Sequence, residues 1–197
     1  MTIIMGVSLK KGKVFCTIST KGGDDIMSKK IAVVLTNLFE DSEYTDPVNA
    51  YKEAGHEVVT IGGKKGDKVH GKTDHTEVVI DLGIDEADPN DFDALLIPGG
   101  FSPDLLRDDD RFVNFTKHFM DEKKPVFAIC HGPQLLITAK ALEGRDATGY
   151  KSIKVDMEYA GANYKDEEVV VCQNQLVTSR TPKDLPAFNR ESLNLLK

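Results

Sequence analysis

The chain has 197 residues, and its 25 Lys and Arg residues against 32 Asp and Glu residues give a formal net charge of −7. This charge argues against a nucleic-acid-binding protein, because such proteins usually present a basic surface. No stretch approaches the ~20 apolar residues that a membrane-spanning helix needs, and the three widely spaced cysteines form neither a disulfide framework nor a zinc cluster. We therefore expect a globular protein of the reducing cytoplasm, with no metal, no membrane and no specific nucleic acid as partner.

The first 26 residues differ in character from the rest. They carry four lysines and two aspartates, a net charge of +2, and end in Lys21-Gly22-Gly23-Asp24-Asp25. The apolar run that follows Met27 is typical of the first buried strand of an α/β domain. We predict that residues 1–26 are an N-terminal extension, disordered or peripheral or folded as a loosely attached hairpin. Residues 27–197 are expected to form a single domain.

Beyond Met27, short apolar runs alternate with helical patterns, which indicates a parallel sheet whose strands are joined by crossover helices. The expected strands are 30–36, 57–61, 94–98, 126–130, 168–172 and 175–178, and the expected helices are 42–54, 110–121, 133–142 and 182–196. A hairpin-like excursion is expected over 65–82. In helix 110–121, the spacing of Phe112, Phe115 and Phe119 is typical of a stripe that faces the core.

An acidic cluster, with Glu40, Asp41 and Glu43, follows the first expected strand and opens a helix. The helix dipole favours acidic residues in the first turn, so one interpretation is that these acids are solvent-exposed and have no functional role. The strand also ends at the crevice of a parallel sheet, where ligands bind. One of these acids can therefore reach a nucleophile in that crevice.

Two glycines, Gly99 and Gly100, end the strand at 94–98 and permit close backbone approach, so their loop is a candidate oxyanion or substrate-binding element. The alternative is a plain strand-ending turn. Asp104 follows in the same loop and is a candidate carboxylate for orienting an imidazole. Its alternative role is to cap a short helix.

Cys130 is the candidate nucleophile. An apolar strand runs directly into it, and Ala128 and Gly132 give the small-x-nucleophile-x-small spacing that the sharp turn of a nucleophile elbow requires. We expect the helix that follows to lower the pKa of the thiol. The alternative is a buried core cysteine, which is how we interpret Cys172. His131 is adjacent and is the candidate base or proton donor.

Together these segments resemble the PfpI-type intracellular protease family, within the class I glutamine amidotransferase-like superfamily, and most resemble its bacterial general stress protein members. The matching motifs cover about residues 28–197: Phe-Glu-Asp-x-Glu at 39–43, Ala-Leu-Leu-Ile-Pro-Gly-Gly at 94–100, Lys-Pro-Val-Phe-Ala-Ile-Cys-His-Gly-Pro-Gln at 124–134 and Thr-Ser-Arg-Thr-Pro-Lys-Asp-Leu at 178–185.

The resemblance implies a flavodoxin-like three-layer α/β/α sandwich with a mostly parallel central sheet. It implies that Cys130 is the nucleophile and that Glu43 is a buried, protonated glutamate hydrogen-bonded to its sulfur. It also implies a homodimer or a larger homo-oligomer, in which an acid from the neighbouring subunit completes a Cys-His-acid triad. The matching acid is Asp104, which is shorter than the glutamate common in relatives. The loop at 71–75 also departs from the usual Gly-Lys-His-Gly.

The first functional hypothesis is a cofactor-independent stress-response enzyme that acts on reactive carbonyls. Cys130 would attack methylglyoxal, as a glyoxalase III-type enzyme does, or an early glycation adduct, as a deglycase does. The alternatives are an intracellular cysteine peptidase acting on unfolded protein, and a non-enzymatic oxidative-stress sensor or chaperone that uses the same cysteine. A glutamine amidotransferase is disfavoured, because residues 175–197 contain no histidine for its His-x-Glu pair.

Overall fold

The computed structural model describes residues 4–10, 13–19 and 27–197. Strands β1 (Ile4–Lys10) and β2 (Lys13–Ser19) pair antiparallel as a two-stranded sheet of their own. The remaining residues of the first 26 lie outside the described part, so the predicted disordered or peripheral extension stays a prediction.

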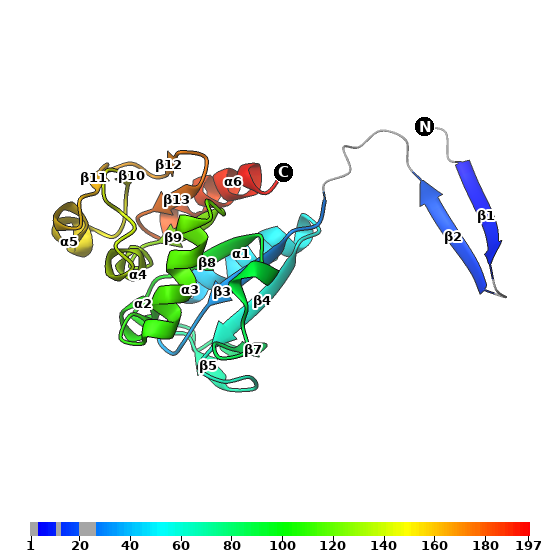
Figure 1. Cartoon of the computed structure of the whole chain (residues 1–197), viewed down its shortest axis with the longest axis horizontal. Coiled ribbons are helices and arrows are strands. Elements are labelled where there is room, and N and C mark those ends of the chain that lie inside the picture. Colours follow the sequence, from blue (N-terminus) through cyan, green and yellow to red (C-terminus); the bar gives the residue numbers. More distant parts are fainter. Residues whose placement is uncertain (1–3, 11–12, 20–26) are drawn as a thin grey trace.

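A seven-stranded sheet forms the centre of the domain, in the order β12-β13-β9-β8-β3-β4-β7 (Figure 1). Every neighbouring pair is parallel except β12 with β13. The mostly parallel sheet that the sequence predicts is therefore confirmed. The strands are β3 (Lys30–Val34), β4 (Glu57–Gly62), β7 (Leu82–Gly83), β8 (Ala94–Ile97), β9 (Val126–Ile129), β12 (Val170–Cys172) and β13 (Leu176–Ser179).

Helices cover both faces of this sheet, because its central strands are apolar on both sides. Along β3, Ala32 and Val34 pack into one buried cluster, whereas Ile31 and Val33 pack into another. The first cluster includes side chains of α3 (Asp110–Asp121) and α4 (Pro133–Thr138), and the second includes side chains of α1 (Asp41–Glu53) and α6 (Leu185–Leu195). The result is the expected three-layer α/β/α sandwich.

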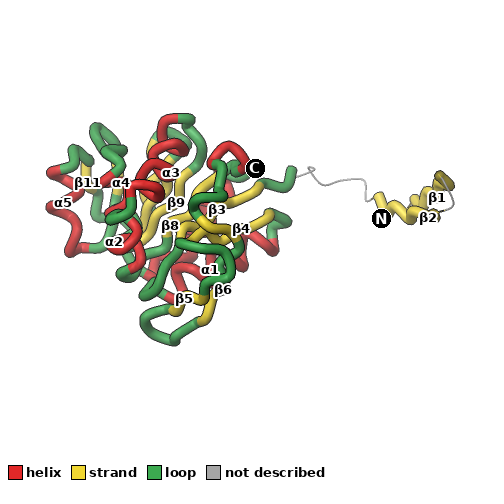
Figure 2. The backbone as a smooth tube through the Cα atoms, turned by 60° about the horizontal axis from the view of Figure 1, so that its bottom comes forward, coloured by secondary structure: helices red, strands yellow, loops and turns green. Residues whose placement is uncertain are grey.

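Shorter elements complete the domain. Strands β5 (Lys68–His70) and β6 (Glu77–Val79) form an antiparallel hairpin, as predicted for 65–82, and Figure 2 shows it beside α1. Helix α2 (Ser102–Leu106) is the short helix that was one interpretation of the loop containing Asp104. Helix α5 (Lys154–Tyr159) and the parallel pair β10 (Asp146–Ala147) and β11 (Asn163–Tyr164) were not expected from the sequence. Among the described residues, no helix has the length and apolar character to cross a bilayer.

Two expected helices differ from the observed ones. Helix α4 ends at Thr138 instead of residue 142, because Lys140 adopts the left-handed backbone conformation with φ 54°. The segment at 182–196 begins with a 3-10 turn, Pro182–Asp184, before α6. Helix α3 begins and ends as predicted, and Phe112, Phe115 and Phe119 are buried.

The strand order reverses between β3 and β8. From β3 the chain continues through α1 to β4 on one side, and it later returns to β8 on the other side. Connections that leave in opposite directions open a crevice at the carboxyl ends of the two strands. The acidic cluster after β3 and the Gly99-Gly100 loop after β8 both face this point, and Cys130 follows the adjacent strand β9.

Candidate active site

Cys130 occupies a sharp, strained turn directly after β9. Its φ is 59°, in the left-handed region that few residues other than glycine adopt. The turn is held by two backbone hydrogen bonds: the N–H of Cys130 donates to the carbonyl of Ser179 at 3.0 Å, and its carbonyl accepts from the N–H of Tyr150 at 2.8 Å. A Cβ at Gly132 would lie 2.5 Å from the carbonyl oxygen of Ile97, so the residue after the turn must be small.

Glu43 projects from the first turn of α1 and is fully buried. Its Oε2 accepts a hydrogen bond of 2.9 Å from the N–H of Gly99. The missing side chain of Gly99 leaves room for this carboxyl group beside Cys130, since a Cβ there would meet Glu43 Oε2 at 2.4 Å and Cys130 Cβ at 2.7 Å. Burial and the nearby negative charge of Glu40 raise the pKa of Glu43 to about 8. At pH 7 the protonated form therefore predominates, and it has a proton to donate toward the sulfur.

The pKa of the Cys130 thiol is raised, which corrects the expectation that the following helix lowers it. The residue is only 6% exposed, and burial disfavours the thiolate. When Glu43 is ionised, its negative charge raises the pKa of Cys130 further, whereas the backbone N–H groups of Gly100 and His131 lower it. The resting Cys130 side chain is thus a thiol that would need a base before it could react, because the two backbone N–H groups do not outweigh its burial.

His131 is placed to be that base. Its Nδ1 lies 3.3 Å from Cys130 Sγ, and its Nε2 lies 3.1 Å from the hydroxyl of Ser152. Burial and the positive charge of Lys72 lower the pKa of His131, so the neutral ring predominates at pH 7. A neutral imidazole that donates its Nε2–H to Ser152 leaves Nδ1 free to accept the thiol proton.

Asp104 does not join this arrangement within the described chain. It lies on α2, where its Oδ1 pairs with Arg107 Nη2 at 2.9 Å and accepts from Gln134 Nε2 at 3.4 Å. Its charge raises the pKa of His131, but the side chain that contacts the outer ring nitrogen is Ser152. The completion of a triad by Asp104 of a neighbouring subunit stays a prediction.

Sequence reasoning missed three further residues of the site. The ring of Tyr150 stacks on His131 with centroids 4.9 Å apart, and Ser152 contacts the same histidine. Lys72, from the loop between β5 and β6, pairs with Glu40 at 2.9 Å and brings a cation near the nucleophile. The unusual loop at 71–75 was the one signal for Lys72, whereas nothing in the spacing marked Tyr150 or Ser152.

Asp41 fixes that loop from the N-terminus of α1. Its carboxylate accepts the backbone N–H groups of Thr73 at 3.0 Å, Asp74 at 3.2 Å and Thr76 at 2.9 Å. Burial alone would raise the pKa of Asp41, but these hydrogen bonds lower it to about 2. Within the described ranges, no group of three or more His, Cys, Asp or Glu side chains could hold a metal ion.

Comparison with known proteins adds independent information. The model of the DJ-1/PfpI family matches residues 29–195. General stress protein 18 of Bacillus subtilis (strain 168) is 71% identical over 171 residues, which cover 87% of this chain and 99% of that protein. The protein named "Putative cysteine protease YraA", of the same strain, is 65% identical over 172 residues, covering 87% and 100%.

A named deglycase and a solved structure are also similar. Protein/nucleic acid deglycase 2 of Escherichia coli (strain K12) is 59% identical over 170 residues, covering 86% of this chain and 99% of that protein. The crystal structure of a ThiJ/PfpI domain protein from Brachyspira murdochii superposes with a TM-score of 0.80 at 29% identity, covering 86% and 96% of the two chains.

Proposed function

The chain belongs to the DJ-1/PfpI family, and from that premise we propose that it is a cysteine-dependent enzyme acting on reactive carbonyl compounds. Its substrate is methylglyoxal or an adduct that such a carbonyl forms with an amine. The observation that carries the proposal is the pairing of Cys130 Sγ with a neutral imidazole nitrogen 3.3 Å away, beside the protonated carboxyl group of Glu43.

The reaction begins with addition of Cys130 Sγ to the aldehyde carbon. A carbon–sulfur bond forms, the carbonyl π bond breaks toward oxygen, and the thiol proton passes to Nδ1 of His131. The N–H groups of Gly100 and His131, which already approach the sulfur, stabilise the negative charge on that oxygen. With an amine adduct, the sulfur replaces the amine at the carbinol carbon: the carbon–sulfur bond forms, the carbon–nitrogen bond breaks, and His131 passes the thiol proton to the departing amine.

The second stage releases the product. In the hemithioacetal of methylglyoxal, His131 moves the proton of the former aldehyde carbon to the neighbouring carbonyl carbon, which yields a thioester of lactate. Water then cleaves the thioester, giving lactate and the free thiol. Glu43, held by Gly99, donates its hydrogen bond to the sulfur whenever sulfur carries negative charge.

A turnover assay tests this proposal. Lactate formation from methylglyoxal and amine release from its adducts are measured with the protein limiting, for the wild type, Cys130→Ala and Cys172→Ala. Cys172 is a matched control, because it is also buried, at 7% exposed, but lies on edge strand β12. We expect many turnovers per chain for the wild type and the control and none for Cys130→Ala. A single stoichiometric burst, or equal activity in all three, would refute catalysis.

A second candidate function is peptide hydrolysis, which the same Cys130–His131 pair favours and which the name of one relative suggests. Cleavage of unfolded protein that is lost in Cys130→Ala and weakened in Asp104→Asn would support it, because Asp104 would then orient His131 from a partner subunit. Carbonyl turnover that is unchanged in Asp104→Asn, with no peptide cleavage, would favour the first proposal.

A further inference from the structure

The outer side of His131 is held by a short 3-10 helix, Lys151–Ile153, and by the residue before it. Ser152 Oγ lies 3.1 Å from His131 Nε2, and the ring of Tyr150 stacks on the imidazole with centroids 4.9 Å apart. On the inner side, His131 Nδ1 lies 3.3 Å from Cys130 Sγ. The imidazole is therefore contacted at both nitrogens and on one face by groups of the same chain.

The backbone that carries Ser152 is anchored, although its side chain is exposed. The N–H of Tyr150 donates to the carbonyl of Cys130 at 2.8 Å, and the carbonyl of Tyr150 accepts from the N–H of Ile153 at 3.0 Å. Ile153 is 3% exposed and belongs to the buried cluster that contains the α3 side chains. An exposed side chain orients a neighbour well when its backbone is fixed in this way. Ser152 thus comes from a segment that is tied directly to the turn of Cys130.

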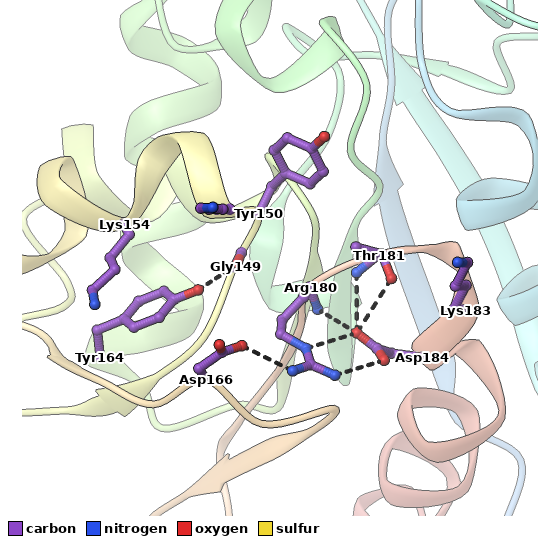
Figure 3. Close-up of a pocket in the computed structure, with 10 residues that line it drawn as sticks. Gly149, Tyr150, Lys154, Tyr164, Asp166, Arg180, Thr181, Lys183 and Asp184 are labelled. Carbon is purple, nitrogen blue, oxygen red and sulfur yellow. Dashed lines mark hydrogen bonds and ion pairs between the residues drawn. The ribbon is translucent and has the colours of Figure 1, made fainter.

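Two further contacts hold the residues that lead into this helix. The hydroxyl of Tyr164 donates to the carbonyl of Gly149 at 2.9 Å, as Figure 3 shows. Gly149 also lies close to the strained turn, since a Cβ there would be 3.2 Å from the carbonyl oxygen of Cys130. One residue earlier, the N–H of Thr148 donates to the hydroxyl of Thr178 on β13 at 2.9 Å. The segment is therefore fixed both to the central sheet and to the turn of Cys130.

The charged groups that act on His131 are Lys72 and Asp104. Burial and the positive charge of Lys72 lower the pKa of His131, and the negative charge of Asp104 raises it. Among residues 27–197, neither side chain forms a hydrogen bond with the ring, whose two contacts are the Cys130 sulfur and the Ser152 hydroxyl. Within one chain, the group that can orient His131 from outside is therefore a neutral hydroxyl and not a carboxylate.

We propose that Ser152 is the positioning residue for this reaction and completes a proton relay of Cys130, His131 and Ser152 inside a single chain, without an acid from a partner subunit. The inference rests on the proposed function, because it takes Cys130 as the nucleophile. In the resting site, His131 donates its Nε2–H to the serine oxygen, and its unprotonated Nδ1 faces the thiol. When Nδ1 takes the thiol proton, both ring nitrogens carry hydrogen, and the serine oxygen still accepts from Nε2.

A serine at this position differs chemically from an acid. A carboxylate would stabilise the imidazolium ion and raise the pKa of His131, which favours a resting pair of thiolate and imidazolium. The serine hydroxyl is neutral, so it fixes the tautomer of the ring and leaves the proton on the sulfur until a substrate is present. Replacing Ser152 by an acid should therefore create a resting thiolate at Cys130.

A titration of the thiolate tests this without turnover. Ultraviolet absorbance of the full chain is followed against pH for the wild type, Ser152→Asp and Val155→Asp, and the signal of Cys16 and Cys172 is subtracted with the Cys130→Ala form of each. Val155 is the matched control, because it is exposed on α5 and its replacement adds the same charge. We expect the midpoint to fall by about one pH unit or more in Ser152→Asp and to change little in Val155→Asp, whose charge is screened. No shift, or equal shifts in both variants, would overturn the assignment.

Kinetics then test the hydroxyl itself. Lactate formation from methylglyoxal is measured across pH for the wild type, Ser152→Ala, Ser152→Thr and the control Val155→Ala. Loss of a hydrogen bond to a charged ring should lower kcat about tenfold in Ser152→Ala, with KM nearly unchanged. The threonine variant keeps the hydroxyl and should restore most of this loss, and the control should match the wild type.

Three kinetic results would overturn the role of Ser152. They are wild-type kcat in Ser152→Ala, an equal loss in Ser152→Thr and Ser152→Ala, and a loss in Asp104→Asn that exceeds the loss in Ser152→Ala. The last result would assign the orienting group to an acid. If the wild type shows no turnover at all, the proposed function fails, whereas the absorbance titration still decides whether Ser152 governs the proton of the Cys130–His131 pair.

Discussion

Two glycines beside Cys130, Gly99 and Gly132, lie where the surrounding atoms leave no room for a side chain. Gly132 faces the carbonyl oxygen of Ile97, and Gly99 lies between Glu43 and Cys130. Both contacts involve groups that cannot move aside, because they are backbone atoms or buried side chains. The position of Cys130 therefore depends on the absence of a side chain at Gly99 and Gly132.

Replacing Gly132 by alanine tests this dependence. The added methyl would overlap Ile97 and Ile129, and overpacking of this kind costs about 1–3 kcal/mol of unfolding free energy. The control is Gly63→Ala, whose Cβ would meet its nearest neighbour at 3.9 Å. Urea unfolding of both variants should show the loss for Gly132→Ala and a change within about 0.5 kcal/mol for Gly63→Ala. Equal stability of the two variants would show that the turn can relax.

The raised pKa of Glu43 predicts that the free energy of unfolding depends on pH. Its pKa rises from 4.5 to about 8 on folding, so the folded state holds its proton more tightly than the unfolded state. Its contribution is complete below pH 4.5 and is lost as pH rises to about 8. We expect the wild type to lose on the order of 3 kcal/mol more than Glu43→Gln between pH 5 and pH 9, since each pKa unit is worth about 1.4 kcal/mol. Parallel pH profiles of unfolding free energy would show that Glu43 ionises freely.

At the scale of elements, α1 and the β5–β6 hairpin act as one unit through Asp41. The hairpin itself is short, and its register is set by the pairing of Lys68 with Val79 and of His70 with Glu77. Its connecting loop is held to the start of α1 by Asp41 and by the N–H of Lys72, which donates to the carbonyl of Phe39 at 2.9 Å. These contacts fix the backbone from which the Lys72 ammonium reaches Glu40.

Asp41→Asn should loosen this unit. The amide has one acceptor oxygen in place of two, and its NH₂ group would face backbone donors, so we expect a loss of about 2–4 kcal/mol in unfolding free energy. Asp46→Asn is the control, because Asp46 is exposed on the same helix. Since folding lowers the pKa of Asp41 to about 2, the wild type should also lose this contribution as pH falls from about 4 toward 2. Equal unfolding free energies for the two variants would contradict the role of Asp41.

The elements differ in how well the sequence predicts them, for physical reasons. Helix α3 has an apolar stripe at helical spacing and an Asp109 cap, and both are local signals. Helix α5 and strands β10 and β11 are six residues or shorter. Segments of that length are stabilised by contacts with the rest of the domain, which no local pattern reveals.

At the scale of the whole molecule, the sheet brings together groups that are far apart in the chain. Glu43 and Gly99 are separated by 56 residues and share a hydrogen bond. The elbow motif, the glycine pair and the acidic cluster each marked a strand end, so the sequence predicted which strand ends would meet. It did not predict that Ser152 would contact His131 in place of Asp104, because Ser152 lies in a short 3-10 helix, Lys151–Ile153, outside the strand pattern.

The two backbone hydrogen bonds of Cys130 also predict its rate of amide hydrogen exchange. Its N–H is bonded to Ser179 at the end of β13, so it exchanges with solvent only when the central sheet opens. The amide of Cys130 should therefore be among the slowest to exchange, with protection close to that of global unfolding. The backbone of Cys130 is therefore ordered during folding, and under the proposed function no ordering of this residue is left to occur when a substrate binds.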